Sequence, residues 1–194
     1  MNADLRVAVT FDDGPHPKNT EGLIRILSER VIPSTFFVLG RNAKSWPDLL
    51  RLMHEAGHEI GNHGWSHTSF DALDDDTLLR ELRETHDVIR KESSQECAIY
   101  RPPYGVIIEH QQLLIKERLG YRPVFWNVDS LDWQRPNVDE LIRLATNLPV
   151  KKAILLFHDF ADVTLDALPR ILDTLLGYEC TFYTASKIVS GLER

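Results

Sequence analysis

The sequence lacks the features that mark membrane, secreted and nucleic-acid-binding proteins. No apolar run approaches the roughly 18 to 20 residues of a transmembrane helix, and the first residues carry no basic and apolar regions of a signal peptide. Acidic residues outnumber basic ones by 29 to 22, and a net charge of −7 leaves no excess of positive charge for a nucleic-acid backbone or an anionic membrane. We expect a protein that is cytoplasmic as given, or extracellular or in the cell envelope if an export signal was trimmed.

Cysteines and glycine-rich loops are equally scarce. Cys97 and Cys180 are far apart in the sequence and form no metal-type pair, so we expect buried thiols rather than a disulfide. No glycine-rich phosphate loop follows the first predicted strand, so the fingerprint of the common nucleotide-binding folds is missing. With 194 residues, of which 43% are hydrophobic, the chain can bury one sizeable core. We expect a single domain over residues 1–194, and the sequence leaves the oligomeric state open.

The most informative stretch is residues 6–15, RVAVTFDDGP. Its near-continuous apolar run predicts a strand covered on both faces, as in a parallel sheet, and the Gly-Pro turn ends it. Asp12 and Asp13 stand where this strand stops. Since neighbouring side chains of an extended segment point to opposite sides, we expect the two carboxylates to lie in different environments. Taken alone, the pair could also belong to an ordinary surface turn.

Strand and helix patterns alternate seven times along the chain. The predicted strands cover residues 7–11, 35–39, 59–62, 98–101, 123–128, 153–157 and 180–183. The predicted helices comprise one that starts at Asn19 or Thr20, five over residues 45–56, 74–91, 108–119, 138–146 and 165–176, and a short terminal one. This alternation predicts an α/β fold of parallel β-α units. Polar residues follow the strands, namely Asp12, Asp13, His63, Arg101, Asp129 and His158. Because strand ends of a barrel converge on one mouth, we predict a (β/α)7-type barrel rather than an open doubly wound sheet.

His63 and His67 stand four residues apart after the third predicted strand. On a helical turn, this spacing places both imidazoles on one face, where a single metal ion can bridge them. A histidine pair alone could equally serve capping or surface roles. With an aspartate from another strand it matches a catalytic metal site, because two imidazoles and one carboxylate leave positions open for water and substrate. Five other histidines are expected on the surface or on helices: His16, His54, His58, His86 and His110.

Five segments together resemble a known pattern. They are TFDDGP at 10–15, the pair within 63–67, RPPYG at 101–105, DSLDW at 129–133 and LFH at 156–158. In this order they resemble the five motifs of the NodB-homology polysaccharide deacetylases, carbohydrate esterase family 4. The resemblance spans nearly the whole chain and implies a distorted barrel. It also implies metal-dependent removal of N-acetyl groups from N-acetylglucosamine-containing glycans of the chitooligosaccharide or peptidoglycan type.

The resemblance assigns catalytic roles by position. The metal ligands would be Asp13, His63 and His67. The ion would be a divalent metal, expected to be zinc, for which cobalt or nickel can substitute. Asp12 would be the general base, and Arg101 would pair with it and keep it ionised. His158 would protonate the departing amine, held in its charged form by Asp132, with Asp129 as the alternative.

A substrate-binding set follows from the same resemblance. The backbone N–H of Tyr104, in a turn stiffened by Pro102 and Pro103, would donate to the oxyanion. Apolar walls would receive the acetyl methyl group and the sugar face. The residues implied in substrate binding are Pro103, Tyr104, Trp133 and Leu156. The partner is therefore expected to be an N-acetylated glycan.

Alternative functions stay open from the sequence alone. The same chemistry would serve an O-acetyl xylan esterase or another amidohydrolase of this fold. A non-catalytic glycan-binding barrel is a third hypothesis, although the complete set of acid, imidazole and guanidinium groups argues against it. No insertion is long enough for an extensive groove, which favours short oligosaccharides or a glycan end. Asp159 is expected to be a cap or turn residue rather than a catalyst.

Overall fold

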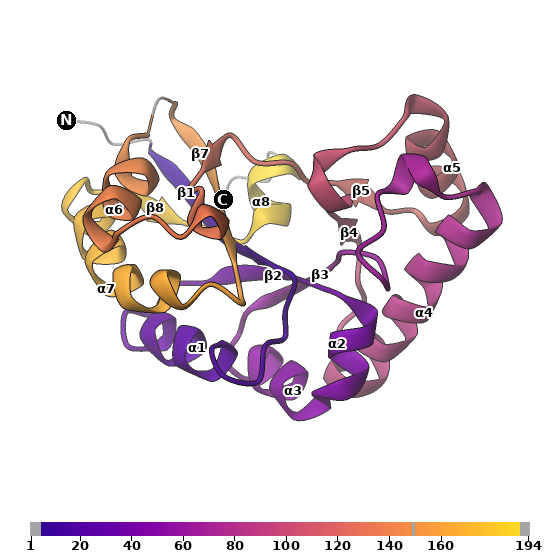
Figure 1. Ribbon diagram of the computed structural model, residues 1–194, viewed down its shortest axis with the longest axis horizontal. Coiled ribbons are helices and arrows are strands. Elements are labelled where there is room, and N and C mark those ends of the chain that lie inside the picture. The colour runs from indigo at the N-terminus through magenta and orange to yellow at the C-terminus, as the bar shows by residue number, and fades with distance from the viewer. Residues whose placement is uncertain (1–4, 149, 191–194) are drawn as a thin grey trace.

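The computed structural model describes residues 5–148 and 150–190, and its strands form one curled parallel sheet with helices outside (Figure 1). The strands are β1 (Arg6–Asp12), β2 (Ser34–Val38), β3 (Glu59–Asn62), β4 (Ile99–Tyr100), β5 (Arg122–Pro123), β6 (Val128–Asp129), β7 (Lys152–His158) and β8 (Thr181–Phe182). Their order is β5-β4-β3-β2-β1-β7-β6, and β8 pairs with the beginning of β1. The predicted α/β barrel of parallel strands is confirmed, as a curled half-barrel. The ends of the predicted domain, residues 1–4 and 191–194, lie outside the described residues.

The prediction of one strand over residues 123–128 is wrong. Two short strands, β5 and β6, take its place at opposite edges of the sheet. The N–H of Val124 still donates to the carbonyl of Tyr100 in β4, whereas the N–H of Asn127 already donates to the carbonyl of Ile154 in β7. The intervening residues cross the open side of the half-barrel and so cannot belong to one strand. Periodicity does not reveal this break, because it depends on partners far away in the sequence.

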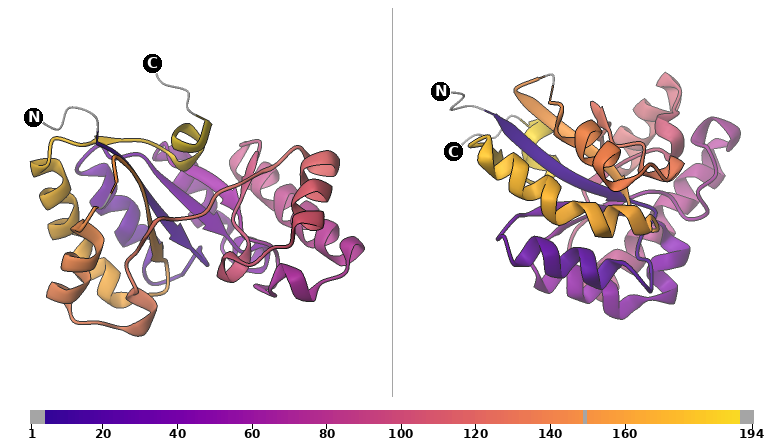
Figure 2. Two further views of the ribbon diagram at one scale, coloured as in Figure 1. Left: turned by 90° about the horizontal axis from the view of Figure 1, so that it is seen from above. Right: turned by 60° about the vertical axis from the view of Figure 1, so that its left-hand side comes forward.

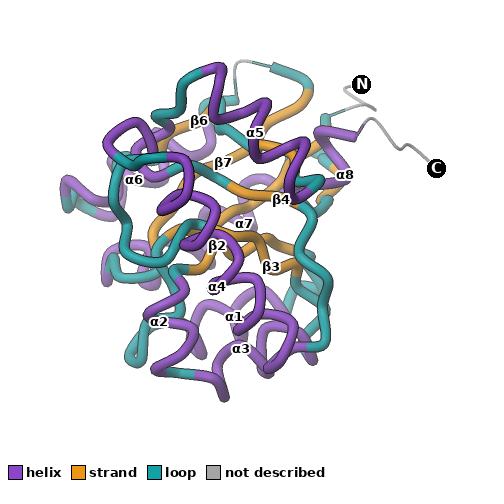
Figure 3. Tube along the Cα trace, turned by 90° about the vertical axis from the view of Figure 1, so that its right-hand side faces the viewer, coloured by secondary structure: helices purple, strands orange, loops and turns teal. Residues whose placement is uncertain are grey.

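Most helices follow the curve of the sheet on its outer side, whereas the last one packs on the opposite face, against Ala8 and Ile154. The α-helices are α1 (Thr20–Ser28), α2 (Gly40–Ser45), α3 (Pro47–Glu55), α4 (Asp75–Ser93), α5 (Glu109–Leu119), α6 (Val138–Thr146), α7 (Asp162–Gly177) and α8 (Ala185–Ser190). The short 3-10 turns are η1 (Phe70–Ala72), η2 (Pro103–Gly105) and η3 (Asp132–Gln134). In Figure 1, α6 and α7 lie at the left, α1 and α3 below, and α4 and α5 at the right. Figure 2 shows α7 running along β1, and Figure 3 shows the strands enclosed by helices when the right-hand side faces the viewer.

The sequence patterns do not predict α2, which lies between the strand predicted over 35–39 and the helix predicted over 45–56. Tertiary contacts form it. The N–H of Gly40 donates to the carbonyl of Gly64 at 2.9 Å. A Cβ at Gly40 would lie 2.3 Å from both Thr85 Oγ1 and the Trp65 ring, so only glycine permits this approach to α4. None of the helices in the described ranges combines the length and apolar character that crossing a membrane requires.

The core lies between the sheet and the outer helices, with β1 at its centre. Phe11 stacks on Phe36 of β2 at a centroid distance of 4.9 Å and on Phe157 of β7 at 5.7 Å. Both cysteines are free thiols, with Cys97 buried and Cys180 half-buried. Burial of three aromatic side chains in one stack fixes the register of the three central strands. Their carboxyl ends therefore meet at one rim, as the prediction required.

Candidate active site

Asp13, His63 and His67 come together at this rim. The Nε2 atoms of His63 and His67 lie 3.4 Å and 3.1 Å from Oδ1 of Asp13. One ligand atom from each residue lies within 4.8 Å of the others. Among the described residues, this is the group of His, Cys, Asp or Glu side chains whose spacing would allow a metal ion to bind. Two imidazoles and a carboxylate form the donor set of a catalytic divalent-metal site that keeps positions open.

The two histidines are not on a helical turn, contrary to the expectation from their spacing. Gly64 and His67 adopt positive φ angles of 77° and 66°, and residues 63–67 form a loop after β3. Glu81 of α4 holds this loop, because its carboxylate accepts the N–H groups of Trp65 and Ser66 and the Ser66 hydroxyl. Glu81 is buried on the face of α4 that carries Leu78 and Leu82. A charge within that apolar stripe was the sequence signal for this support, and the prediction missed it.

Asp12 and Asp13 share one environment, so the prediction that they point to different environments is wrong. Asp13 leaves the strand with φ of 73°, which breaks the alternation of side chains. The side-chain amide of Asn42 donates to the Asp13 carbonyl at 2.7 Å and stabilises this turn. His63 Nε2 is therefore near both carboxylates, 3.7 Å from Asp12 Oδ2 and 3.4 Å from Asp13 Oδ1.

The orientation of His63 fits a metal ligand. Its Nδ1 lies 2.7 Å from the carbonyl oxygen of Arg101. Since a carbonyl only accepts, Nδ1 carries the hydrogen, and Nε2 of the neutral ring presents a lone pair to Asp13. Oδ1 of Asp13 is itself buried and accepts no well-formed hydrogen bond. Two acceptors this close require a cation between them, either a proton on Nε2 or a metal ion.

Burial and neighbouring charges shift the pKa values of all three candidate metal ligands. Burial would raise the pKa of Asp13, but the contact with His63 and the charges of His63 and His67 lower it. Burial would lower the pKa of His63, yet the charge of Asp12 and the contact with Asp13 raise it. Burial lowers the pKa of His67. In the metal-free chain, a proton on His63 therefore competes with a metal ion.

Arg101 is fully buried behind the candidate metal ligands and binds Asp12. Its Nη1 donates to Asp12 Oδ1 at 2.7 Å and to the Thr10 hydroxyl at 2.8 Å, and its Nε donates to the carbonyl of Val124. The guanidinium also lies over the ring of Phe37, with 4.2 Å to the centroid. Arg101 thus fixes one carboxylate oxygen of Asp12 and leaves the other turned toward His63.

His158 ends β7 directly beside Asp12, its register partner in β1. Its Nδ1 lies 2.7 Å from Asp132 Oδ1. Burial would lower the pKa of His158, but the hydrogen bond and charge of Asp132, with the charges of Asp12 and Asp13, raise it. Asp129 contacts the N–H of Leu131 instead. Of the two aspartates considered from the sequence, Asp132 is the one that holds the imidazole.

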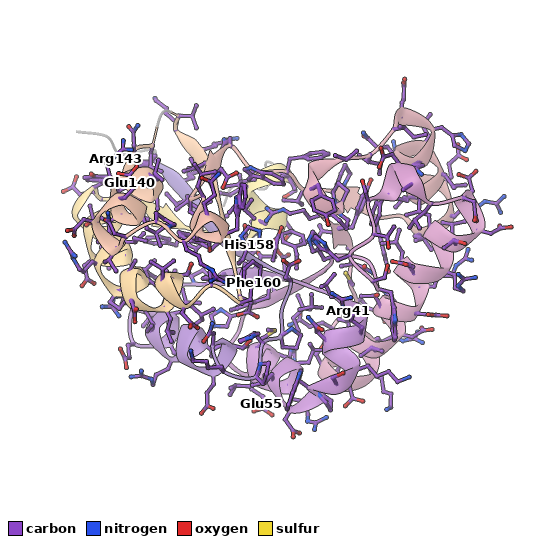
Figure 4. All side chains as sticks on the ribbon, in the orientation of Figure 1. Arg41, Glu55, Glu140, Arg143, His158 and Phe160 are labelled. Atoms are coloured by element: carbon purple, nitrogen blue, oxygen red, sulfur yellow. The ribbon has the colours of Figure 1, made fainter. Side chains whose placement is uncertain are left out.

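A cavity of about 410 Å³, here called the catalytic cavity, opens over these groups. Besides the candidate metal ligands, Asp12 and His158, it is lined by Tyr104, Trp126, Asp129, Trp133, Leu156 and Phe160. Pro103 is buried in η2 and does not line the cavity. Figure 4 shows Phe160 beside His158 near the middle of the molecule. Trp126 and Phe160 were not predicted, and no motif marks them; Phe160 could have been noticed as an aromatic residue two positions after the histidine.

Asp159 lies in the turn after β7, as expected, whereas His58 departs from its sequence-based interpretation. Asp159 is fully buried, and burial raises its pKa to about 7. It accepts from the Thr20 hydroxyl at 2.8 Å, and its N–H donates to the Asp12 carbonyl. His58, expected on the surface or a helix, is buried against Phe36 without hydrogen-bond partners on its ring, and burial lowers its pKa to about 4.

Comparison with known proteins gives consistent matches. Residues 2–124 match the family model described as polysaccharide deacetylase. A chitooligosaccharide deacetylase from Rhizobium leguminosarum bv. trifolii is 36% identical over 156 residues, which cover 80% of this chain and 72% of that protein. A peptidoglycan-N-acetylglucosamine deacetylase from Bacillus cereus is 29% identical, covering 92% of this chain and 66% of its own length. The solved structure of the T48 deacetylase with substrate superposes with a TM-score of 0.91 at 33% identity, over 98% of this chain and 93% of that one.

Proposed function

This chain belongs to the polysaccharide deacetylase family, and we propose that it hydrolyses N-acetyl groups of N-acetylglucosamine residues in chitooligosaccharide- or peptidoglycan-type glycans. The observation that carries the proposal is the convergence of Asp12, held by Arg101, and His158, held by Asp132, on one cavity beside a metal-type cluster. Amide hydrolysis needs both a proton acceptor for water and a proton donor for the amine.

The proposed proton transfers use the chain's own groups. Asp12 takes the proton of the attacking water through the oxygen that Arg101 leaves free. His158 gives a proton to the departing amine, for which its raised pKa keeps it charged. Amines are poor leaving groups until they are protonated, so the Asp132–His158 pair suits an amide.

Asp13, His63 and His67 would hold a divalent ion, and zinc is the metal we propose, with cobalt or nickel as substitutes. When bound, such an ion supplies positive charge that polarises a carbonyl and acidifies a nearby water. The backbone N–H of Tyr104 is proposed as a further donor to the developing oxyanion. Trp133 and Leu156 provide apolar walls for the acetyl methyl group.

The test is acetate release from a panel of chitooligosaccharides, peptidoglycan glycan fragments and acetylated xylan. The enzyme is measured as purified, after chelation, and after zinc or cobalt is added back. Metal-dependent release from an N-acetylated glycan supports the proposal, and exclusive release from acetylated xylan would assign an esterase instead. Binding of glycan without acetate release from any member would identify a non-catalytic barrel.

A further inference from the structure

A second hollow adjoins the catalytic cavity. It has a volume of about 320 Å³ and is lined by Asp132, Arg135, Phe160, Ala161, Asp162 and Val163. We call it the Arg135 hollow. Phe160 lines both spaces, is 43% exposed, and its ring centroid lies 5.3 Å from that of His158. Phe160 is therefore the lining residue that the two spaces have in common.

The charges of the two acids in this hollow are already balanced. Asp132 is fully buried and holds the His158 imidazole. Asp162 pairs with Lys18 at 2.8 Å and accepts from the side chain of Asn19 at 3.1 Å. The exposed guanidinium of Arg135 forms no ion pair or hydrogen bond within the described residues.

Acidic residues close to Arg135 in the sequence have other partners. Asp139 pairs with Arg170 at 2.8 Å, and Glu140 binds Arg143 through both carboxylate oxygens. Arg135 thus has no counter-ion among the described residues, although the chain has a net charge of −7 and the hollow lies beside the proposed catalytic histidine. This arrangement leaves a forked donor available for a ligand.

We propose that the Arg135 hollow binds the sugar next to the one being deacetylated and favours a sugar that carries a carboxylate. This proposal rests on the proposed deacetylase function. The exposed face of Phe160 can take the apolar face of a pyranose ring, and Ala161 and Val163 add apolar walls. A guanidinium presents paired N–H donors that match the two oxygens of a carboxylate. The substrate class is thus a glycan in which N-acetylglucosamine alternates with an acidic sugar.

The experiment compares three tetrasaccharides in acetate release. The first alternates N-acetylglucosamine with N-acetylmuramic acid and carries no peptide, the second is its carboxyl methyl ester, and the third is tetra-N-acetylchitotetraose. We expect the wild type to favour the free acid over its methyl ester by about tenfold in kcat/KM, the factor of one charge-assisted hydrogen bond. Arg135→Gln should abolish this preference by raising KM for the free acid alone, with kcat unchanged.

Two further variants separate charge recognition from stacking. Phe160→Ala should raise KM for all three tetrasaccharides alike, because stacking of the Phe160 ring on a sugar does not depend on the substrate's carboxylate. Arg143→Gln removes an arginine on α6 that is paired with Glu140 and does not line the hollow, and it should keep the wild-type preference (Figure 4). Thermal melting of each variant verifies that it folds.

Several results would overturn the inference. It is wrong if the wild type treats the free acid and the methyl ester alike, or if Arg135→Gln weakens both equally. Binding of the same tetrasaccharides is measured in parallel by calorimetry. If no tetrasaccharide releases acetate, the proposed function fails, while a loss of binding of the free acid alone in Arg135→Gln would still support the hollow as its site. Equal binding of the free acid by the wild type and Arg135→Gln would reject it.

Discussion

Asp132 holds His158 with both carboxylate oxygens: Oδ1 lies 2.7 Å from Nδ1 of the ring, and Oδ2 accepts the backbone N–H of the same residue at 2.7 Å. Oδ2 also accepts from the Thr164 hydroxyl at 2.6 Å. One buried residue therefore fixes the imidazole, the end of β7 and the beginning of α7. Asp132 thus both orients the imidazole of His158, the proposed acid, and favours its charged form.

Asp132→Asn separates these two contributions, since the amide keeps the shape and loses the charge. We expect kcat to fall on the order of a hundredfold, the typical contribution of one general acid. If His158 is the acid, as proposed, activity requires its charged form and is lost as pH rises through its pKa. Without the Asp132 charge that pKa falls, so the alkaline limb of the pH profile should move to lower pH. Asp129→Asn should leave that limb in place, and an unmoved limb in Asp132→Asn would contradict the role of Asp132.

Asp12→Asn removes the proposed base and leaves the buried charge of Arg101 without its partner. We expect kcat to fall at least roughly a hundredfold and the free energy of unfolding to fall by about 3 kcal/mol. Adding Arg101→Met should recover part of the stability, because the unpaired charge is gone, but none of the activity. Denaturant unfolding and acetate release measure the two effects. Full activity in either variant would exclude Asp12 as the base.

His67→Ala removes one of the three proposed metal ligands without touching the buried pair behind them. In the wild type, added zinc should raise the melting temperature in a concentration-dependent way, because the ion binds only the folded chain. The variant should show little of this rise and a weaker affinity in competition with a chelator. His110→Ala, an exposed histidine paired with Asp75, is the matched control. A zinc-dependent rise of equal size in both variants would place the ion elsewhere.

Asp159→Asn tests the buried carboxyl beneath the loop that carries Asp13. Burial raises the pKa of Asp159 from 3.8 to about 7 in the folded chain. Between these pH values the folded state therefore binds more protons than the unfolded state. The contribution of protonated Asp159 to wild-type stability is full below about pH 4 and is lost as pH rises to about 7. The loss corresponds to at most about 4 kcal/mol.

The asparagine variant should lack this pH dependence. Its free energy of unfolding, relative to that of the wild type, should therefore be higher at pH 8 than at pH 4. Asp162→Asn, at an exposed position, should keep the wild-type dependence. Chemical denaturation at a series of pH values measures both. Parallel curves for Asp159→Asn and the wild type would show that Asp159 does not titrate in this range.

The sequence predicts those features that local pattern determines. The apolar run of β1 and its Gly-Pro ending predict the strand and the position of Asp12. The alternation of elements predicts the barrel, and therefore that the carboxyl ends meet. Residue type alone suggests that an aspartate and two histidines at such a rim form a donor set.

Features that depend on distant partners were out of reach. The positive φ of Asp13 relies on a hydrogen bond from Asn42, and the loop of His67 relies on Glu81. The break between β5 and β6 depends on which strands lie at the edges of the sheet. The backbone conformations of Asp13 and of the His67 loop do not follow from residue spacing. The environments of the two aspartates and the shape of the histidine loop were therefore predicted wrongly.

The central position of β1 also determines when the site can form during synthesis. All three proposed metal ligands lie within residues 13–67, yet β1 gains its second long neighbour only from β7, where Thr10 bonds to Leu155, 145 residues later. Pairing of such distant segments is slow and comes late. A nascent chain that still lacks β7 exposes one side of β1 to solvent and to other chains. We therefore expect the proposed metal ion to be captured only after β7 has joined the sheet, and shortened versions of the chain that keep Asp13, His63 and His67 but lack β7 should fail to hold it.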